Sequence, residues 1–160
     1  MKSIIVYYSL EGNCKLIAEA MAQEIGADTL ALKPKKDIPI SGPLKYLLGG
    51  KSAMKKEQPE LENKNLGIVN DYDLIIVGAP VWAGTYAPAI RSFSEGTQLK
   101  EKKMAFFACS GGGSTVKCIE HMEATFPGNQ FISNISFINP LKNAESCTSK
   151  ATEWAKTLVD

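Results

Sequence analysis

Two short, continuous apolar runs constrain the fold of this chain more than any other feature. The first reads DLIIVGAP from Asp73 and ends in Gly-x-Pro, and the second reads KMAFFACS from Lys103. Neither run alternates between polar and apolar residues, so each predicts a strand that is buried on both faces. Strands of this kind belong to parallel sheets whose two faces are covered by helices.

Strand-like and helix-like segments alternate along the rest of the chain. Further strands are expected at residues 3–8, from Asp28 (DTLALK) and from Gln130 (QFISNISFI), and helices at residues 13–25, 114–126 and 147–159. The alternation predicts a three-layer α/β fold, in which a five-stranded parallel sheet with right-handed crossovers lies between helices. Residues 1–160 are expected to form one domain, with residues 33–72 as a long, lysine-rich surface excursion between the second and third strands.

Charge and cysteine content narrow the classes of function. The 160 residues carry 18 basic and 17 acidic side chains, and no basic stripe of the kind that follows a nucleic-acid backbone is visible. We therefore expect a small-molecule partner and no nucleic acid. The four widely spaced cysteines indicate neither a zinc site nor a disulfide framework. No apolar stretch has the form of a membrane span or a signal segment, so the chain is expected to be cytoplasmic.

Three loops follow strand ends at the edge where parallel sheets bind ligands. They read SLEGNC (residues 9–14), APVWAGTY (residues 79–86) and SGGGST (residues 110–115). In open parallel sheets, ligands bind outside the carboxyl ends of the strands, where the winding order reverses. These three loops are therefore the candidate site.

The first loop has the form of an anion site. Ser9 offers a hydroxyl, and Gly12 lets the backbone approach a ligand closely. Asn13 can cap the helix that Cys14 opens, and the N–H groups of a helix start converge on one spot. The motifs G-x-x-x-x-G-K-[ST] and G-x-G-x-x-G are absent after this strand, so neither an NTPase nor a dinucleotide site is indicated. The acid Glu11 lies in the middle of this loop, and a plain glycine-containing turn is the alternative.

The second and third loops point to a flat ligand. Trp82 offers an indole platform for a planar ring, and packing of Trp82 over the sheet edge is the alternative. The third loop exposes backbone N–H groups that can bond the carbonyl edge of a ring, unless it is a flexible turn without a ligand. The only histidine, His121, is expected to lie away from the loops in a surface or structural role.

Taken together, the three loops resemble those of the flavodoxin family, and the resemblance covers nearly the whole chain. In that family the first loop reads S/T-x-T-G-x-T and wraps the phosphate of FMN. Ser9, Gly12 and Asn13 match this pattern, whereas Glu11 and Cys14 stand where threonines are usual. The resemblance implies a flavodoxin-like sandwich with strand order 2-1-3-4-5 and FMN as the cofactor.

The two departures from the family pattern affect the phosphate loop. Glu11 is expected to turn its carboxylate to solvent, with Lys15 close enough in sequence to offset its charge. Cys14 offers only a weak S–H donor in place of a hydroxyl. Phosphate binding is therefore expected to be retained but weakened.

The resemblance also implies roles in the other two loops. Trp82 would stack on the flavin, and the Ala83-Gly84 peptide matches the one whose carbonyl turns toward flavin N5 on one-electron reduction. A glycine at the third position of that turn permits the positive φ of a type II geometry. The third loop lacks the tyrosine that commonly covers the outer ring face, so Tyr86 or Tyr46 is a candidate to cover it. The implied cofactor-binding residues are Ser9, Glu11, Gly12, Asn13, Cys14, Pro80, Val81, Trp82, Ala83, Gly84, Thr85, Tyr86, Ser110, Gly111, Gly112 and Gly113.

Two redox functions follow from the resemblance. One is an electron carrier that docks on a partner protein, and the other is a small reductase that uses NAD(P)H to reduce a quinone or similar acceptor. The near-neutral charge favours the reductase, because the family's low-potential carriers are strongly acidic and negative charge disfavours the anionic reduced flavin. The Ala83-Gly84 turn favours the carrier. A module that binds another phosphorylated ligand is the non-redox alternative.

Overall fold

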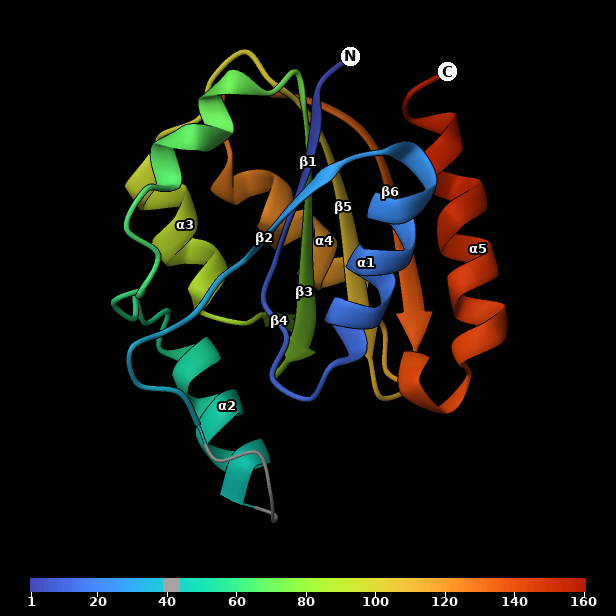
Figure 1. Cartoon of the computed structure of the whole chain (residues 1–160). Helices are drawn as coiled ribbons and strands as arrows, with labels where there is room; N and C mark the ends of the chain where they lie inside the picture. Colours follow the sequence, from blue (N-terminus) through green and yellow to red (C-terminus); the bar gives the residue numbers. More distant parts are fainter. Residues whose placement is uncertain (39–43) are drawn as a thin grey trace.

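The chain is described by a computed structural model that covers residues 1–38 and 44–160. Figure 1 shows a central sheet with helices on both faces and with the two chain ends close to the same end of the sheet. For residues 44 and 46 only the backbone is described. The expectation that Tyr46 covers a ligand therefore lies outside the described residues.

Five parallel strands form the main sheet. They are β1 (Ser3–Tyr7), β2 (Asp28–Ala31), β3 (Leu74–Trp82), β5 (Lys103–Ser110) and β6 (Gln130–Ile138). Their order is β2-β1-β3-β5-β6, which confirms the expected order of the five strands. An additional two-residue strand, β4 (Thr85–Tyr86), pairs antiparallel with the end of β3 and was not anticipated. The winding of the chain reverses between β1 and β3, which places a ligand site at their carboxyl ends.

Helices cover both faces of this sheet. They are α1 (Asn13–Ile25) and α5 (Ala144–Thr157) on one face, and α3 (Ala89–Thr97) and α4 (Val116–Thr125) on the other. Alternate residues of β3 enter different cores, because successive strand side chains point to opposite faces. Ile75 and Val77 join the core beneath α3 and α4, whereas Leu74 and Ile76 join the core beneath α1 and α5. The continuous apolar run therefore marks a strand buried on both faces, as expected.

The excursion between β2 and β3 carries two helical segments, α2 (Leu44–Met54) and the 3-10 helix η1 (Leu66–Asp71). An isolated bridge between Pro34 and Leu61 joins the segments before and after α2. The excursion is not wholly a surface feature, because Gly49 on α2 is buried. A Cβ atom added at Gly49 would lie 3.3 Å from Cδ2 of Trp82, so the absence of a side chain lets α2 pack directly on the indole.

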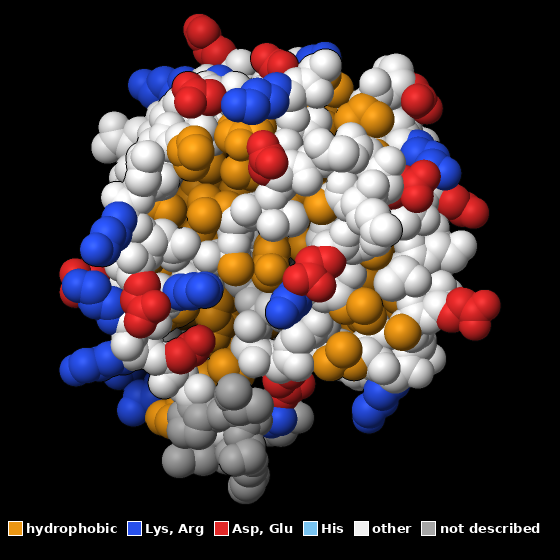
Figure 2. Space-filling view, in the orientation of Figure 1, with side chains coloured by type: hydrophobic (Ala, Val, Ile, Leu, Met, Phe, Trp, Pro, Cys, Tyr) orange, Lys and Arg blue, Asp and Glu red, His pale blue; other side chains and the backbone are white. Residues whose placement is uncertain are grey.

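Charges of both signs are interspersed on the face of the molecule seen in Figure 2, and this face carries no continuous basic stripe. This distribution agrees with the formal net charge of +1. Among the described helices, none is long and apolar enough to cross a membrane.

Candidate functional site

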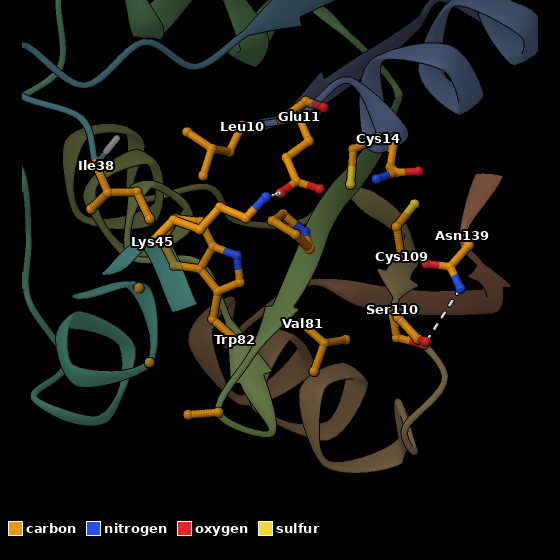
Figure 3. A pocket seen from close by; sticks show the side chains of 17 residues that line it. Leu10, Glu11, Cys14, Ile38, Lys45, Val81, Trp82, Cys109, Ser110 and Asn139 are labelled. Atoms are coloured by element: carbon orange, nitrogen blue, oxygen red, sulfur yellow. Dashed lines mark hydrogen bonds and ion pairs between the residues drawn. The ribbon is translucent and has the colours of Figure 1, made fainter. Parts of the chain in front are cut away.

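The three loops meet around a cavity of about 370 Å³ at the carboxyl ends of β1, β3 and β5 (Figure 3). This volume is in the range of small-molecule and cofactor sites. Ten of the expected residues line the cavity: Ser9, Glu11, Asn13, Cys14, Pro80, Val81, Trp82, Ala83, Ser110 and Gly111. The cavity is hereafter called the central cavity.

Some expected residues do not line the central cavity, and some residues that line it were not expected. The expected residues Gly12, Gly84, Thr85, Tyr86, Gly112 and Gly113 do not line the central cavity, although all lie in the three loops. Seven residues of the lining were not anticipated: Leu10, Ile38, Lys45, Gly49, Gly50, Cys109 and Asn139. Leu10 and Cys109 adjoin expected residues and Asn139 directly follows the last strand, so position alone could have suggested them. Nothing local marks Ile38 or Lys45, which come from the excursion.

The first loop winds around the hydroxyl of Ser9. Its Oγ accepts hydrogen bonds from the N–H groups of Gly12 at 3.1 Å and Lys15 at 3.2 Å. Gly12 has φ 106°, a left-handed conformation that favours glycine, and it stands at the N-cap of α1. The N–H groups of Asn13 and Cys14 lie in the first helical turn, where no intrahelical acceptor exists. They are therefore available to an anion at the cavity wall.

The side chain of Asn13 does not cap its own helix, contrary to expectation. Its Oδ1 instead accepts a hydrogen bond of 3.0 Å from the N–H of Leu141, in the 3-10 helix η2 (Pro140–Lys142) that follows β6. Asn13 thus fixes the segment after the last strand against the first loop.

Glu11 forms an ion pair with Lys45 of α2 (Figure 3). The side chain of Glu11 is 37% exposed and that of Lys45 is 17% exposed, so the cation is the more sheltered partner. Lys15 instead pairs with Glu19 one helical turn further on, at 3.8 Å. The expectation that Lys15 offsets the charge of Glu11 is therefore wrong, and the compensating charge comes from the excursion.

Two buried thiols lie beside the first loop. The thiols of Cys14 and Cys109, the latter at the end of β5, lie near one another, and both residues line the central cavity (Figure 3). Burial, followed by the neighbouring Cys109, raises the pKa of Cys14 well above its ordinary value. Cys14 therefore presents a neutral thiol to the cavity where the family usually has a hydroxyl.

Trp82 packs against the sheet edge and also lines the central cavity. The indole is half-buried, packs edge-on against Tyr8 with ring centroids 5.4 Å apart, and also lines the central cavity. The hydroxyl of Tyr8 donates a hydrogen bond of 2.6 Å to Asp37 of the excursion. Burial, followed by this bond to a carboxylate, raises the pKa of Tyr8. Trp82 is thereby held at a fixed angle beside the cavity.

The turn after Trp82 is a two-residue hairpin between β3 and β4. Ala83 has φ 49° and Gly84 has φ 79°, so both central residues are left-handed. Positive φ at both positions defines a type I′ turn, and the expected type II geometry is wrong. A type I′ turn matches the twist of the two strands that it joins, which explains why β4 forms.

Tyr86 and His121 lie at the hairpin but not where they were expected. Tyr86 is 3% exposed, and its hydroxyl lies 2.5 Å from Oγ1 of Thr125 and accepts a hydrogen bond of 2.8 Å from Arg91. It is therefore buried away from the central cavity. His121 on α4 lies against the second loop, with Nδ1 2.8 Å from Oγ1 of Thr85, so its expected separation from the loops is wrong.

The third loop is anchored by Asn139. Its side-chain amide donates to the carbonyl oxygen of Gly111 at 3.2 Å, and its backbone N–H donates to that of Ser110 at 2.9 Å. Ser110 is buried, whereas the three glycines after it are exposed. The loop therefore presents backbone rather than side chains at the rim of the cavity.

A parallel sheet in this order, with an anion-type loop and an aromatic loop at the switch point between β1 and β3, defines a nucleotide- or flavin-binding α/β protein. A sequence profile described as Flavodoxin matches residues 2–158. The chain belongs to the flavodoxin family.

Known proteins resemble the chain in sequence or in fold. The sequence is 32% identical over 95 residues to an NAD(P)H dehydrogenase (quinone) of Caulobacter vibrioides, an alignment that covers 58% of this chain and 44% of that protein. A flavoprotein of Lactobacillus acidophilus in complex with FMN superposes with a TM-score of 0.71 at 24% identity, covering 91% of this chain and 98% of that one. A WrbA-like flavodoxin of Agrobacterium tumefaciens gives a TM-score of 0.67 at 14% identity, over 98% and 96% of the two chains.

Proposed function

We propose that the protein binds FMN in the central cavity and passes electrons from NAD(P)H to a quinone-like acceptor. The observation that carries the proposal is the convergence of three loops on one cavity: a helix start rich in free N–H groups, a fixed indole and a glycine loop. FMN is the cofactor, in keeping with membership of the flavodoxin family and with the FMN complex of the Lactobacillus flavoprotein. The Caulobacter relative supports the quinone as acceptor.

The residues around the cavity fit this cofactor. The N–H groups of Asn13 and Cys14 would bind the phosphate, because a helix start favours an anion. Trp82 would stack on the flavin ring. The backbone of Ser110 and Gly111 would bond the carbonyl edge of the ring, in the position that Asn139 fixes.

Bound FMN would supply the redox chemistry of a two-electron transfer from NAD(P)H to a quinone, and the second proton of the hydroquinone would come from solvent. The protein itself would bind FMN and orient it. Among the described lining residues Glu11 is the only acid, and Lys45 neutralises it. Negative charges near the flavin destabilise its anionic reduced form, so this form is more stable in a nearly neutral site than in an acidic one. The near-neutral site therefore favours two-electron chemistry.

An electron carrier is the second candidate. The resemblance to the family favours it, because the Ala83-Gly84 turn corresponds in sequence to the family's flavin N5 loop, and Ala83 lines the cavity. A carrier would accumulate the one-electron reduced flavin and would not oxidise nicotinamide, whereas the reductase would do the reverse.

Two measurements test the proposal. FMN and riboflavin are titrated into the apoprotein, and FMN is expected to bind distinctly more tightly because only FMN carries a phosphate. Gly12→Val should weaken the binding of FMN, because valine is strained at φ 106° and would displace the N–H groups at the start of α1. The loaded protein is then mixed with NADH or NADPH and a quinone without oxygen. Failure to bind any flavin would leave the non-redox alternative, and flavin binding without nicotinamide oxidation would leave the carrier.

A further inference from the structure

A second hollow, of about 730 Å³, lies on the other side of the hairpin turn from the central cavity. It is bounded by the end of α2, the hairpin of β3 and β4, α3 and α4. Ala83 lines both hollows, so the turn at residues 83 and 84 is all that separates them at this point. This second hollow is hereafter called the lateral groove. Its position beside the turn gives a bound molecule a short path to the central cavity.

The best-fixed cation of the lateral groove is Arg91 on α3. Its Nη2 donates a hydrogen bond of 2.8 Å to the hydroxyl of the buried Tyr86, and its guanidinium carbon lies 5.6 Å from the centre of the Tyr86 ring. The Tyr86 hydroxyl is in turn held by Thr125 at 2.5 Å. A guanidinium has five N–H donors, and this bond occupies one of them. Arg91 is thus a pre-oriented donor at the groove wall.

Two further basic side chains lie on α4 in the same wall. Lys117 and His121 are four residues apart and therefore lie on one face of the helix. His121 is tied to the hairpin by its bond to Thr85, which fixes the ring at the rim. The opposite wall contributes Lys56 at the end of α2.

The remaining groups of the groove leave an excess of positive charge. Its carboxylates belong to Glu57, which already accepts a hydrogen bond from Ser52 at 2.5 Å, and Glu95. They are outnumbered by Lys56, Arg91 and Lys117, and His121 adds a further donor. The floor and rim are apolar, with Met54 74% exposed and prolines at positions 88 and 127. An apolar body with an anionic end fits this combination.

We propose that the lateral groove binds the anionic group of a planar redox substrate, a phosphate or a sulfonate or carboxylate, with the ring of the substrate directed over the hairpin turn toward the central cavity. The proposal rests on the proposed function, because it assigns that function a substrate class. The anion belongs either to the nicotinamide nucleotide or to an acidic acceptor, and the same cations serve both. Arg91 and Lys117 would be binding residues and His121 would line the site.

The single histidine makes a site-specific assay possible. His121 supplies the only imidazole C–H signals in the NMR spectrum of the full chain, and it lines the groove. Anthraquinone-2-sulfonate and ADP-ribose are titrated separately, with the uncharged 2-(hydroxymethyl)anthraquinone as the control for the sulfonate. A saturable shift of the His121 signals by a charged probe, and a much weaker response to the uncharged one, is the expected result. A response to anthraquinone-2-sulfonate alone would assign the groove to the acceptor, and a response to ADP-ribose alone to the donor.

Lysine variants test whether the groove cations cause the response. Lys117→Gln and Lys56→Gln, both at exposed positions, should each raise the dissociation constant of the charged probe by about threefold, as expected for the loss of one exposed charge pair. Lys64→Gln, an exposed lysine outside the groove, should have no effect. No shift of His121 with either charged probe, or equal weakening by Lys64→Gln, would overturn the proposal. The assay needs no turnover, so loss of nicotinamide oxidation with an intact His121 response would count against the proposed function alone.

Discussion

Removal of the Glu11 carboxylate is expected to tighten FMN binding. Glu11 lies in the loop that would hold the phosphate, and its carboxylate pairs with Lys45. Glu11→Gln removes a negative charge from beside the phosphate, so the repulsion between the loop and the phosphate falls. Lys45→Gln is expected to have the opposite effect, because it leaves the Glu11 carboxylate uncompensated.

The size of the effect follows from the charges and their exposure. At an effective dielectric constant of about 40, a unit charge about 7 Å from a phosphate of charge near −2 interacts with it by about 2 kcal/mol. Solvent reaches Glu11, whose side chain is 37% exposed, and salt screens it further. We therefore expect about 1 kcal/mol, which is about fivefold in Kd, in each direction.

Flavin fluorescence quenching measures this change in the apoprotein, with riboflavin as the matched ligand. Riboflavin lacks the phosphate, so its Kd should change little in either variant, and the double variant should return FMN binding close to that of the wild type. The FMN effects should shrink at high salt. If Glu11→Gln raises the Kd of FMN, or if it changes the Kd values of FMN and riboflavin by the same factor, the phosphate does not bind beside Glu11.

Four further substitutions test the site and the fold. Trp82→Ala should make the free energy of FMN binding less favourable by about 1–3 kcal/mol in the same titration. Unchanged binding would mean that Trp82 packs against Tyr8 without contacting the flavin. Gly78→Ala should destabilise the fold by about 3 kcal/mol or more in urea unfolding, because its Cβ would lie 1.9 Å from Cζ of Phe107, whereas Gly113→Ala enters open space and should be nearly neutral. Burial raises the pKa of Cys118 to about 12 from its ordinary value of 9.0, so the stability that its neutral thiol contributes is complete below pH 9 and is lost as the pH rises toward 12. The midpoint temperature of thermal unfolding should therefore fall less steeply above pH 9 in Cys118→Ala than in the wild type. Parallel plots of this temperature against pH would contradict the reasoning.

The layers of the fold and the location of the site could be predicted from sequence because each depends on local periodicity. The apolar runs of β3 and β5 predicted central strands, and β3 is buried from Leu74 to Ala79 and β5 from Met104 to Ser110. The loops that end these strands meet at one edge, because the carboxyl ends of parallel strands always do. The type of the hairpin turn could not be predicted in the same way. The sequence offered one glycine for a turn that requires two positive φ angles, and the non-glycine residue Ala83 adopts the other positive φ.

The sequence by itself determined the alternation of strands and helices and the three loops at the carboxyl ends of the strands, and the resemblance to the family added the strand order. The tertiary structure alone decided which charges meet there. Lys45 reaches Glu11 because α2 packs through Gly49 on Trp82, and no periodicity within the excursion encodes that packing. His121 similarly meets Thr85, 36 residues away, only when α4 covers the sheet beside β4. Such contacts arise when separate elements pack together. Local sequence patterns predict whether a residue lies in a helix or a strand, and they do not predict which other element it will contact.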